Sequence, residues 1–149
     1  MRQMKWLGLA MMVFSAFAMA QATPEKVITK NGVSFISGGV GIGSMERLAA
    51  REKEFNLKLV FTVVEGNYLA DVGVTVKDAA GKTVIEQVAD GPVFLAKLPA
   101  GAYSVSAVYE GKAQTRKVAV RDDKLRTEYM RWPSKPGVDF PLPREETRK

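Results

Sequence analysis

Alternation of apolar and polar residues is the strongest signal in the second half of the chain. Val72, Val74 and Val76 fall on one face of a predicted strand, and residues 103–109 carry apolar or aromatic side chains at every odd position. Turn sequences separate these runs at 78–81, 90–92, 99–101 and 110–111. Short strands with turns at regular spacing predict an antiparallel β-sandwich or barrel.

Further predicted strands complete this pattern, and they lie at 84–88, 93–98, 112–120 and 125–132. Glu110-Gly111 has the composition of a tight hairpin turn, because glycine adopts the positive φ that such turns need. We therefore expect 112–120 to pair back on 103–109.

A strand, a loop and a helix are predicted before this region. Residues 33–37 alternate weakly, and the glycine-rich run 38–43 breaks regular structure. Ser44 is placed to cap an amphipathic helix of about three turns, which Asn56 ends.

Residues 57–64 are apolar on both alternating faces except at Lys58 and Thr62. This pattern is typical of a strand that is covered on both sides. We expect the preceding helix to cover one of them.

The first 22 residues have the pattern of a secretory signal peptide. A basic start and an apolar run at 6–20 lead into small residues, so cleavage is expected after Ala22, with Ala20 as the alternative. The run is shorter than the roughly 20 apolar residues that a spanning helix needs. We therefore expect an exported, periplasmic protein with no membrane span after cleavage.

The composition removes most catalytic chemistry. The 149 residues include no Cys and no His, so thiolates, disulfides, imidazole bases and the commonest zinc ligands are absent. The 16 Asp and Glu residues are compatible with a carboxylate pair for glycoside hydrolysis. Six of them lie mostly at predicted turns or strand edges, where acids serve turn formation and solubility: Asp71, Asp78, Asp90, Glu110, Asp122 and Asp123. We expect no enzyme, no metal site and no cofactor.

Residues 57–132 resemble a known domain. Val-x-Val-x-Asp-x-x-Gly at 74–81, Asp-Gly at 90–91 and Leu-Pro-Ala-Gly-x-Tyr at 98–103 are similar to the carboxypeptidase regulatory-like domain. The resemblance implies a mainly β fold, a seven-stranded transthyretin-like or Ig-like antiparallel sandwich with Tyr103 in its core. It implies no catalytic residues, because the domain is an accessory in the peptidases that gave it its name.

With its glycine-rich segment and helix, the whole chain also resembles a group of small exported bacterial proteins that carry this domain. The expected organisation is a signal peptide (1–22), an N-terminal strand, loop and helix (23–56), the sandwich (57–132) and a proline-rich extended tail (133–149).

The first candidate site is the loop with Gly38, Gly39, Gly41 and Gly43. Backbone N–H groups at the start of a helix suit phosphate, but the glycine spacing departs from the dinucleotide fingerprint and no Gly-Lys-Ser/Thr follows. A tightly turned connection between strand and helix is the favoured interpretation, and a binding loop for another ligand is the alternative.

Positive charge is concentrated near the end of the predicted sandwich, where residues 112–135 carry eight basic and three acidic side chains. The candidate binding residues are Lys112, Arg116, Lys117, Arg121, Lys124, Arg126 and Arg131. We expect a basic sheet edge, which either attracts an anionic partner or only discourages edge-to-edge aggregation.

Together these patterns predict an exported, non-enzymatic β-sandwich module that binds or supports another cell-envelope component, either a protein or an anionic component. Its contact would be the basic edge or the proline-rich tail. The alternative is a periplasmic carrier of a small ligand, a glycan or a lipid, with the loop 38–43 lining the site. Nucleic acid is not an expected partner after export.

Overall fold

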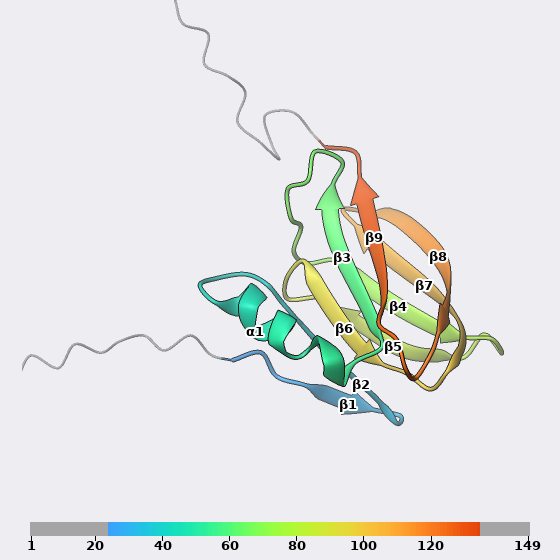
Figure 1. Cartoon of the computed structure of the whole chain (residues 1–149). Coiled ribbons are helices and arrows are strands. Elements are labelled where there is room, and N and C mark those ends of the chain that lie inside the picture. The colour runs from blue at the N-terminus through green and yellow to red at the C-terminus, as the bar shows by residue number, and fades with distance from the viewer. Residues whose placement is uncertain (1–23, 135–149) are drawn as a thin grey trace, which may run out of the picture.

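Two β-sheets packed face to face form the body of the protein, with one short helix outside them (Figure 1). This computed structural model describes residues 24–134. The predicted signal peptide and the tail from residue 135 onward lie outside the described residues. The described residues confirm a mainly β protein with the two layers of a sandwich.

The first sheet has five strands in the order β1-β2-β6-β3-β9. Their bounds are β1 Ile28–Lys30, β2 Val33–Gly38, β3 Leu57–Val63, β6 Val93–Lys97 and β9 Arg126–Trp132. The prediction of a wholly antiparallel sandwich is wrong in this sheet, because β3 and β9 run parallel. The chain crosses from the second sheet and enters beside the start of β3, where the Arg126 N–H donates to the Asn56 carbonyl at 2.9 Å.

The second sheet has four antiparallel strands in the order β5-β4-β7-β8. Their bounds are β4 Gly73–Asp78, β5 Thr83–Val88, β7 Gly101–Tyr109 and β8 Lys112–Val120. The hairpin between β7 and β8 is confirmed, and both of its turn residues have positive φ, 47° at Glu110 and 77° at Gly111.

The described residues contain nine strands, so the expected count of seven is not confirmed. β1 and β2 are part of the first sheet and do not merely precede it, since β2 pairs with β6 from Ser34 to Gly38. Phe35 faces the core between the sheets while Ile36 faces the helix, and both are buried. β2 is an internal strand, since it lies between β1 and β6, and both of its faces are covered.

The core lies between the two sheets and uses the alternating positions that the sequence indicates. Val72, Val74 and Val76 are buried there, as are three of the four predicted inward positions of β7, while Tyr109 is partly buried against the core. Tyr103 is 8% exposed, and its hydroxyl donates to the Pro99 carbonyl at 2.6 Å. The ring therefore lies in the core as expected, and its hydroxyl also ties the turn before β7 to the core.

The helix is shorter than predicted and covers different strands. α1 spans Ser44–Ala50, and a 3₁₀ turn, η1, follows at Glu52–Glu54. This helical segment packs on β2 and β6. Leu48 of α1 and Phe55, which follows η1, form an apolar cluster with residues of those two strands: Ile36, Val93 and Leu95. The outer face of β3 is not covered by α1. No helix within 24–134 is long and apolar enough to cross a membrane.

Ser44 does not cap this helix, so that prediction is wrong. The N-cap is Gly43, whose φ of 76° is left-handed, and Ser44 is the first helical residue. The Ser44 hydroxyl is already engaged, because it accepts from the Gly39 N–H at 2.8 Å.

Asn56 joins the end of the helical segment to the end of β6. Its side-chain amide donates to the Leu98 carbonyl at 2.7 Å and accepts from the Leu98 N–H at 2.9 Å, in a buried position. The amide therefore satisfies two backbone groups that would otherwise be buried without partners.

Side-chain hydrogen bonds close the sandwich where its edge strands β8 and β9 meet. The Trp132 indole donates to the Lys112 carbonyl at 2.9 Å, and the Gln114 amide donates to the Arg131 carbonyl. The corner between the two strands is closed by a bridge between Arg121 and Lys124. β8 and β9 are thus held together without forming a common ladder.

Candidate functional site

The seven basic candidate residues are distributed over several surfaces. Lys117 pairs with Ser104 on the outer face of the second sheet, whereas Arg131 pairs with Thr62 on the outer face of the first. The other five lie along the rim between β8 and β9 and in the corner that joins them: Lys112, Arg116, Arg121, Lys124 and Arg126.

Two of these basic residues have carboxylate partners at the rim. Arg121 pairs with Asp123 at 3.1 Å, and Arg126 pairs with Glu128 at 2.6 Å. Exposed pairs of this kind contribute little to stability but reduce the local positive charge. Binding of an anionic partner at the rim stays a prediction.

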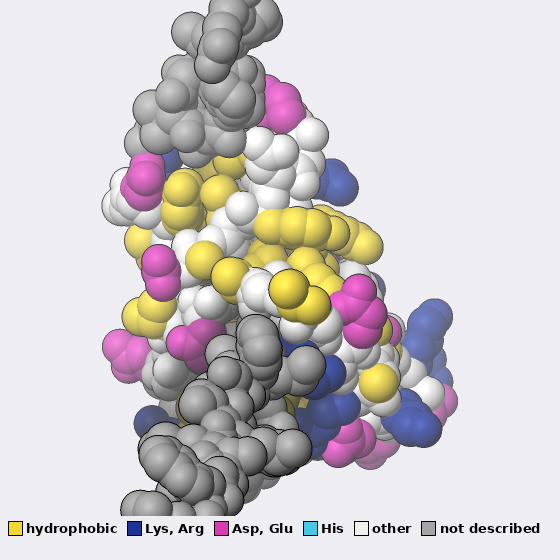
Figure 2. All heavy atoms as spheres, turned by 90° about the vertical axis from the view of Figure 1, so that its left-hand side faces the viewer, with side chains coloured by type: hydrophobic (Ala, Val, Ile, Leu, Met, Phe, Trp, Pro, Cys, Tyr) yellow, Lys and Arg dark blue, Asp and Glu magenta, His cyan; other side chains and the backbone are white. Residues whose placement is uncertain are grey.

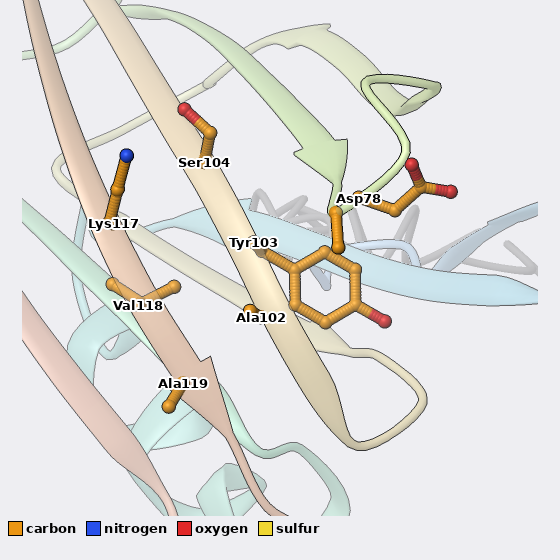
Figure 3. Close-up of a pocket in the computed structure, with 8 residues that line it drawn as sticks. Asp78, Ala102, Tyr103, Ser104, Lys117, Val118 and Ala119 are labelled. Carbon is orange, nitrogen blue, oxygen red and sulfur yellow. The ribbon is translucent and has the colours of Figure 1, made fainter.

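A hollow of about 500 Å³ lies at one end of the outer face of the second sheet (Figure 3). Its polar groups are largely engaged by the fold: Asp78 accepts from the N–H groups of Ala80 and Lys82, and the Tyr103 hydroxyl bonds to Pro99. Ser104 and Lys117 project side by side from neighbouring strands (Figure 3). Small alanines make up much of the remaining lining, so the hollow presents little specific chemistry.

The glycine-rich loop is built by backbone geometry. Gly39, Gly41 and Gly43 have φ values of 102°, 87° and 76°, which side-chain-bearing residues rarely adopt. Gly38 ends β2, and a Cβ there would lie 2.7 Å from Glu25 Cγ. These facts support the interpretation as a tight connection between strand and helix.

A partly buried polar cluster holds this loop to the start of the described chain. The Arg47 guanidinium donates to the two Glu25 carboxylate oxygens at 3.0 and 2.9 Å, and the Ser44 hydroxyl donates to the same carboxylate. The hydrogen bond from Arg47 lowers the pKa of Glu25 from 4.5 to about 2, against the opposing effect of burial and with help from Ser44.

This cluster is unsuited to nucleophilic catalysis. A carboxylate with a pKa of about 2 is a weak base near neutral pH, and Ser44 is 1% exposed. The cluster is better suited to anchoring residues 24–27 against the loop. Within residues 24–134, no group of three potential metal ligands is placed to hold an ion.

The Glu25 cluster should make stability depend on pH in the acid range. Because the folded state lowers the pKa of Glu25, the ion pair stabilises the fold above pH 4.5, and this contribution is lost as the pH falls from 4.5 to about 2. We expect the melting temperature of the chain to exceed that of Glu25→Gln at about pH 7, and the difference to shrink across this window. Calorimetry over a pH series measures it; a difference that stays constant down to pH 2 would contradict the role of the charged carboxylate.

The outer face of the first sheet has one half that α1 leaves uncovered, formed by β3 and β9. Val60 of β3 is paired with Tyr129 of β9, and Thr62 is paired with Arg131. On the edge of β3 away from β9, Tyr68 forms an isolated β-bridge with Thr62. We call this surface the tyrosine face, and its residues are Val60, Thr62, Val64, Tyr68, Tyr129 and Arg131.

Large apolar groups are exposed on the tyrosine face. Tyr68 is 62% exposed, Tyr129 is 53% exposed and Val64 is 63% exposed. Figure 2 views the molecule from the side that bears the helix and shows hydrophobic side chains gathered at the surface there. The Arg131 guanidinium lies over the Tyr129 ring, 5.4 Å from its centroid, and makes no ion pair within the described residues.

Thr62 adds a polar group without a partner to this face. It is 6% exposed, and its hydroxyl makes no hydrogen bond to any described residue. A buried hydroxyl without a partner costs about 1 to 3 kcal/mol. Two exposed aromatic rings, a cation and an unpaired hydroxyl together are typical of a binding surface.

The sequence prediction named Arg131 for its charge but missed Tyr68 and Tyr129. A signal was present for Tyr129, because it alternates with the inward residues Met130 and Trp132 and is therefore an aromatic residue on the outward face. Tyr68 lies in the connection after β3, where the sequence carries no period.

Comparison with known proteins gives no assignment: no protein-family model matches the chain, and no curated protein matches it.

Proposed function

We propose that this chain is an exported, non-enzymatic β-sandwich module that binds another component of the cell envelope through the tyrosine face. The single observation that carries this proposal is the exposure of Tyr68 and Tyr129 on either side of a buried, unpaired Thr62 hydroxyl. Aromatic residues and arginine are enriched where proteins bind each other, because they bury large areas and retain polar ends.

The other candidate surfaces support a binding role less well. In the hollow beside Asp78, most polar groups are already hydrogen-bonded within the fold. The Glu25 cluster anchors residues 24–27 to the glycine-rich loop. The resemblance of 57–132 to the carboxypeptidase regulatory-like domain agrees with an accessory role and with a transthyretin-like arrangement of β3 to β9. Export is proposed from the leader pattern of residues 1–22.

Affinity capture from crosslinked cell envelopes tests this proposal. We expect the double variant Tyr68→Ser with Tyr129→Ser to recover at least about tenfold less partner than the unchanged chain, equivalent to about 1.4 kcal/mol of binding free energy. The matched control is Val88→Ser with Val108→Ser, which removes exposed apolar groups from the outer face of the second sheet. This control should capture the same partner at the same level.

A third variant, Arg116→Glu with Arg121→Glu, tests the basic rim. Loss of capture in this variant, with full capture by the tyrosine double variant, would overturn the proposal and place binding at the rim. Melting temperatures of all three variants should stay close to that of the unchanged chain, because every substituted side chain is exposed or partly exposed.

A further inference from the structure

The chain leaves β9 at the border of the tyrosine face. The Val64 N–H donates to the Trp132 carbonyl at 2.9 Å, and the Ser134 hydroxyl donates to the Glu65 carboxylate. These bonds hold the last described residues against the connection that carries Val64 and Tyr68. Whatever follows Ser134 therefore begins within a few residues of the exposed apolar groups.

The sequence after this point is suited to turn back at once. Lys135-Pro136-Gly137-Val138 has proline and glycine at the two central positions of a type II turn. Tyr129 lies three residues before Trp132, roughly 10 Å back along the strand at about 3.3 Å per residue. A six-residue extended segment at about 3.1 Å per residue spans roughly 19 Å, which is enough to pass over the face.

The following residues also match the face in chemistry. Val138, Phe140 and Leu142 are apolar, and Pro141 and Pro143 favour an extended chain that has few amide donors to satisfy. Proline-rich segments dock on surfaces of exposed aromatic rings. Asp139 supplies a negative charge for Arg131, whose guanidinium has no carboxylate partner among residues 24–134.

We propose that residues 138–143 of the same chain dock on the tyrosine face. Phe140 and Leu142 pack against the rings of Tyr68 and Tyr129, and Asp139 pairs with Arg131. This contact buries the exposed rings until a partner displaces the segment. The regulatory meaning rests on the function proposed above, but the docking itself does not require a partner to be present.

Paramagnetic NMR on the exported chain tests the docking directly. The chain has no Cys, so Thr147→Cys supplies one site for a nitroxide label in the ¹⁵N-labelled protein. We expect strong broadening of the amide signals of Thr62, Tyr68 and Tyr129, and recovery of these signals when the nitroxide is reduced. The amides of the outer face of the second sheet, such as that of Val108, should be much less affected.

Two double variants of the labelled chain provide the controls. Phe140→Ser with Leu142→Ser should remove the selective broadening, whereas Glu145→Ser with Glu146→Ser, an equal number of changes to serine in the same tail, should retain it. Well-dispersed spectra show that each variant is folded. Selective broadening that survives the first pair of changes would overturn the proposal.

A mixture of ¹⁵N-labelled chain with spin-labelled, unenriched chain separates docking within one molecule from docking between copies. We expect no selective broadening in the mixture. Broadening there would assign the segment to a second copy, and uniform broadening in the single-chain sample would mean that the segment has no fixed site; either result overturns the proposal.

The failure of this inference is distinguishable from failure of the proposed function. If residues 138–143 dock but the double variant Tyr68→Ser with Tyr129→Ser captures as much partner as the unchanged chain, the intramolecular contact stands and the proposed function is overturned. If both hold, Phe140→Ser with Leu142→Ser should increase capture at least about tenfold, because the competitor at the face is removed.

Discussion

Replacing Trp132 with alanine is expected to lower the free energy of unfolding by about 3 to 5 kcal/mol, because truncating a buried aromatic side chain removes apolar contacts and leaves a cavity. The side chain is 2% exposed and lies 6.3 Å from the Phe61 ring and 5.9 Å from the Tyr109 ring, centroid to centroid. Phe61 belongs to the first sheet and Tyr109 to the second. Trp132 therefore joins the two sheets at the edge where β8 and β9 meet.

Denaturant unfolding followed by circular dichroism measures this loss, since the variant lacks the buried indole that would serve as a fluorescent reporter. Trp132→Phe is the matched control. It retains an aromatic ring but loses the hydrogen bond to the Lys112 carbonyl, so we expect a smaller loss of about 1 to 3 kcal/mol. A loss below about 1 kcal/mol for the alanine variant would mean that the sheets are not joined by this side chain.

Gly91→Ala is expected to lower the free energy of unfolding by about 3 kcal/mol or more, at or above the upper end of the cost of overpacking a core. A Cβ at this position would lie 2.2 Å from the Gly38 carbonyl oxygen and 2.4 Å from its carbonyl carbon. Both contacts are with backbone of β2, which is held in the sheet by β6 and cannot rotate away. Relief of the clash would require β2 to move away from the turn before β6.

Gly73→Ala is the matched control for this effect. Its Cβ would lie 3.8 Å from the nearest atom, the Val108 carbonyl oxygen, which is an ordinary contact. We expect this substitution to leave the free energy of unfolding unchanged or to raise it by about 0.4 to 1 kcal/mol, since alanine restricts the unfolded chain. Equal stability of the two variants in thermal unfolding would show that β2 and the 90–92 turn are not packed as described.

The local parts of the fold were predictable because their signals are local. The alternation at 103–109 identifies the inward side chains of β7, and Glu110-Gly111 identifies the hairpin that pairs β7 with β8. Tyr103 was predicted to enter the core after the turn at 99–101, and it does. Each of these features depends on residues that are close in sequence.

Strand partners far apart in sequence were not predictable in the same way. Nothing in 126–132 indicates that this strand pairs in parallel with 57–63, because the pairing depends on where the corner after β8 delivers the chain. The same limit applies to the helix, which lies on β2 and β6. Serine is a common helix-capping residue, but the Ser44 hydroxyl is occupied elsewhere: it donates to Glu25 and accepts from the Gly39 N–H.

The candidate site was only partly predictable for a related reason. Charge identified Arg131, but the surface around it is assembled from β3, β9 and the connection that carries Tyr68. A single exposed tyrosine has no distinctive pattern in sequence. The register of two parallel strands is what places Tyr129 and Arg131 beside Val60 and Thr62.

The parallel pairing of β3 with β9 also has a consequence for how the chain is made. One edge of β3 pairs with β6, but its other edge gains a partner only about seventy residues later, and a loop of that length is closed at an entropic cost that grows with separation. During synthesis the first sheet stays incomplete until residues 126–132 have been made, because β9 is its last strand in chain order. The second sheet, whose last strand ends at Val120, is therefore synthesised in full before the first sheet can close.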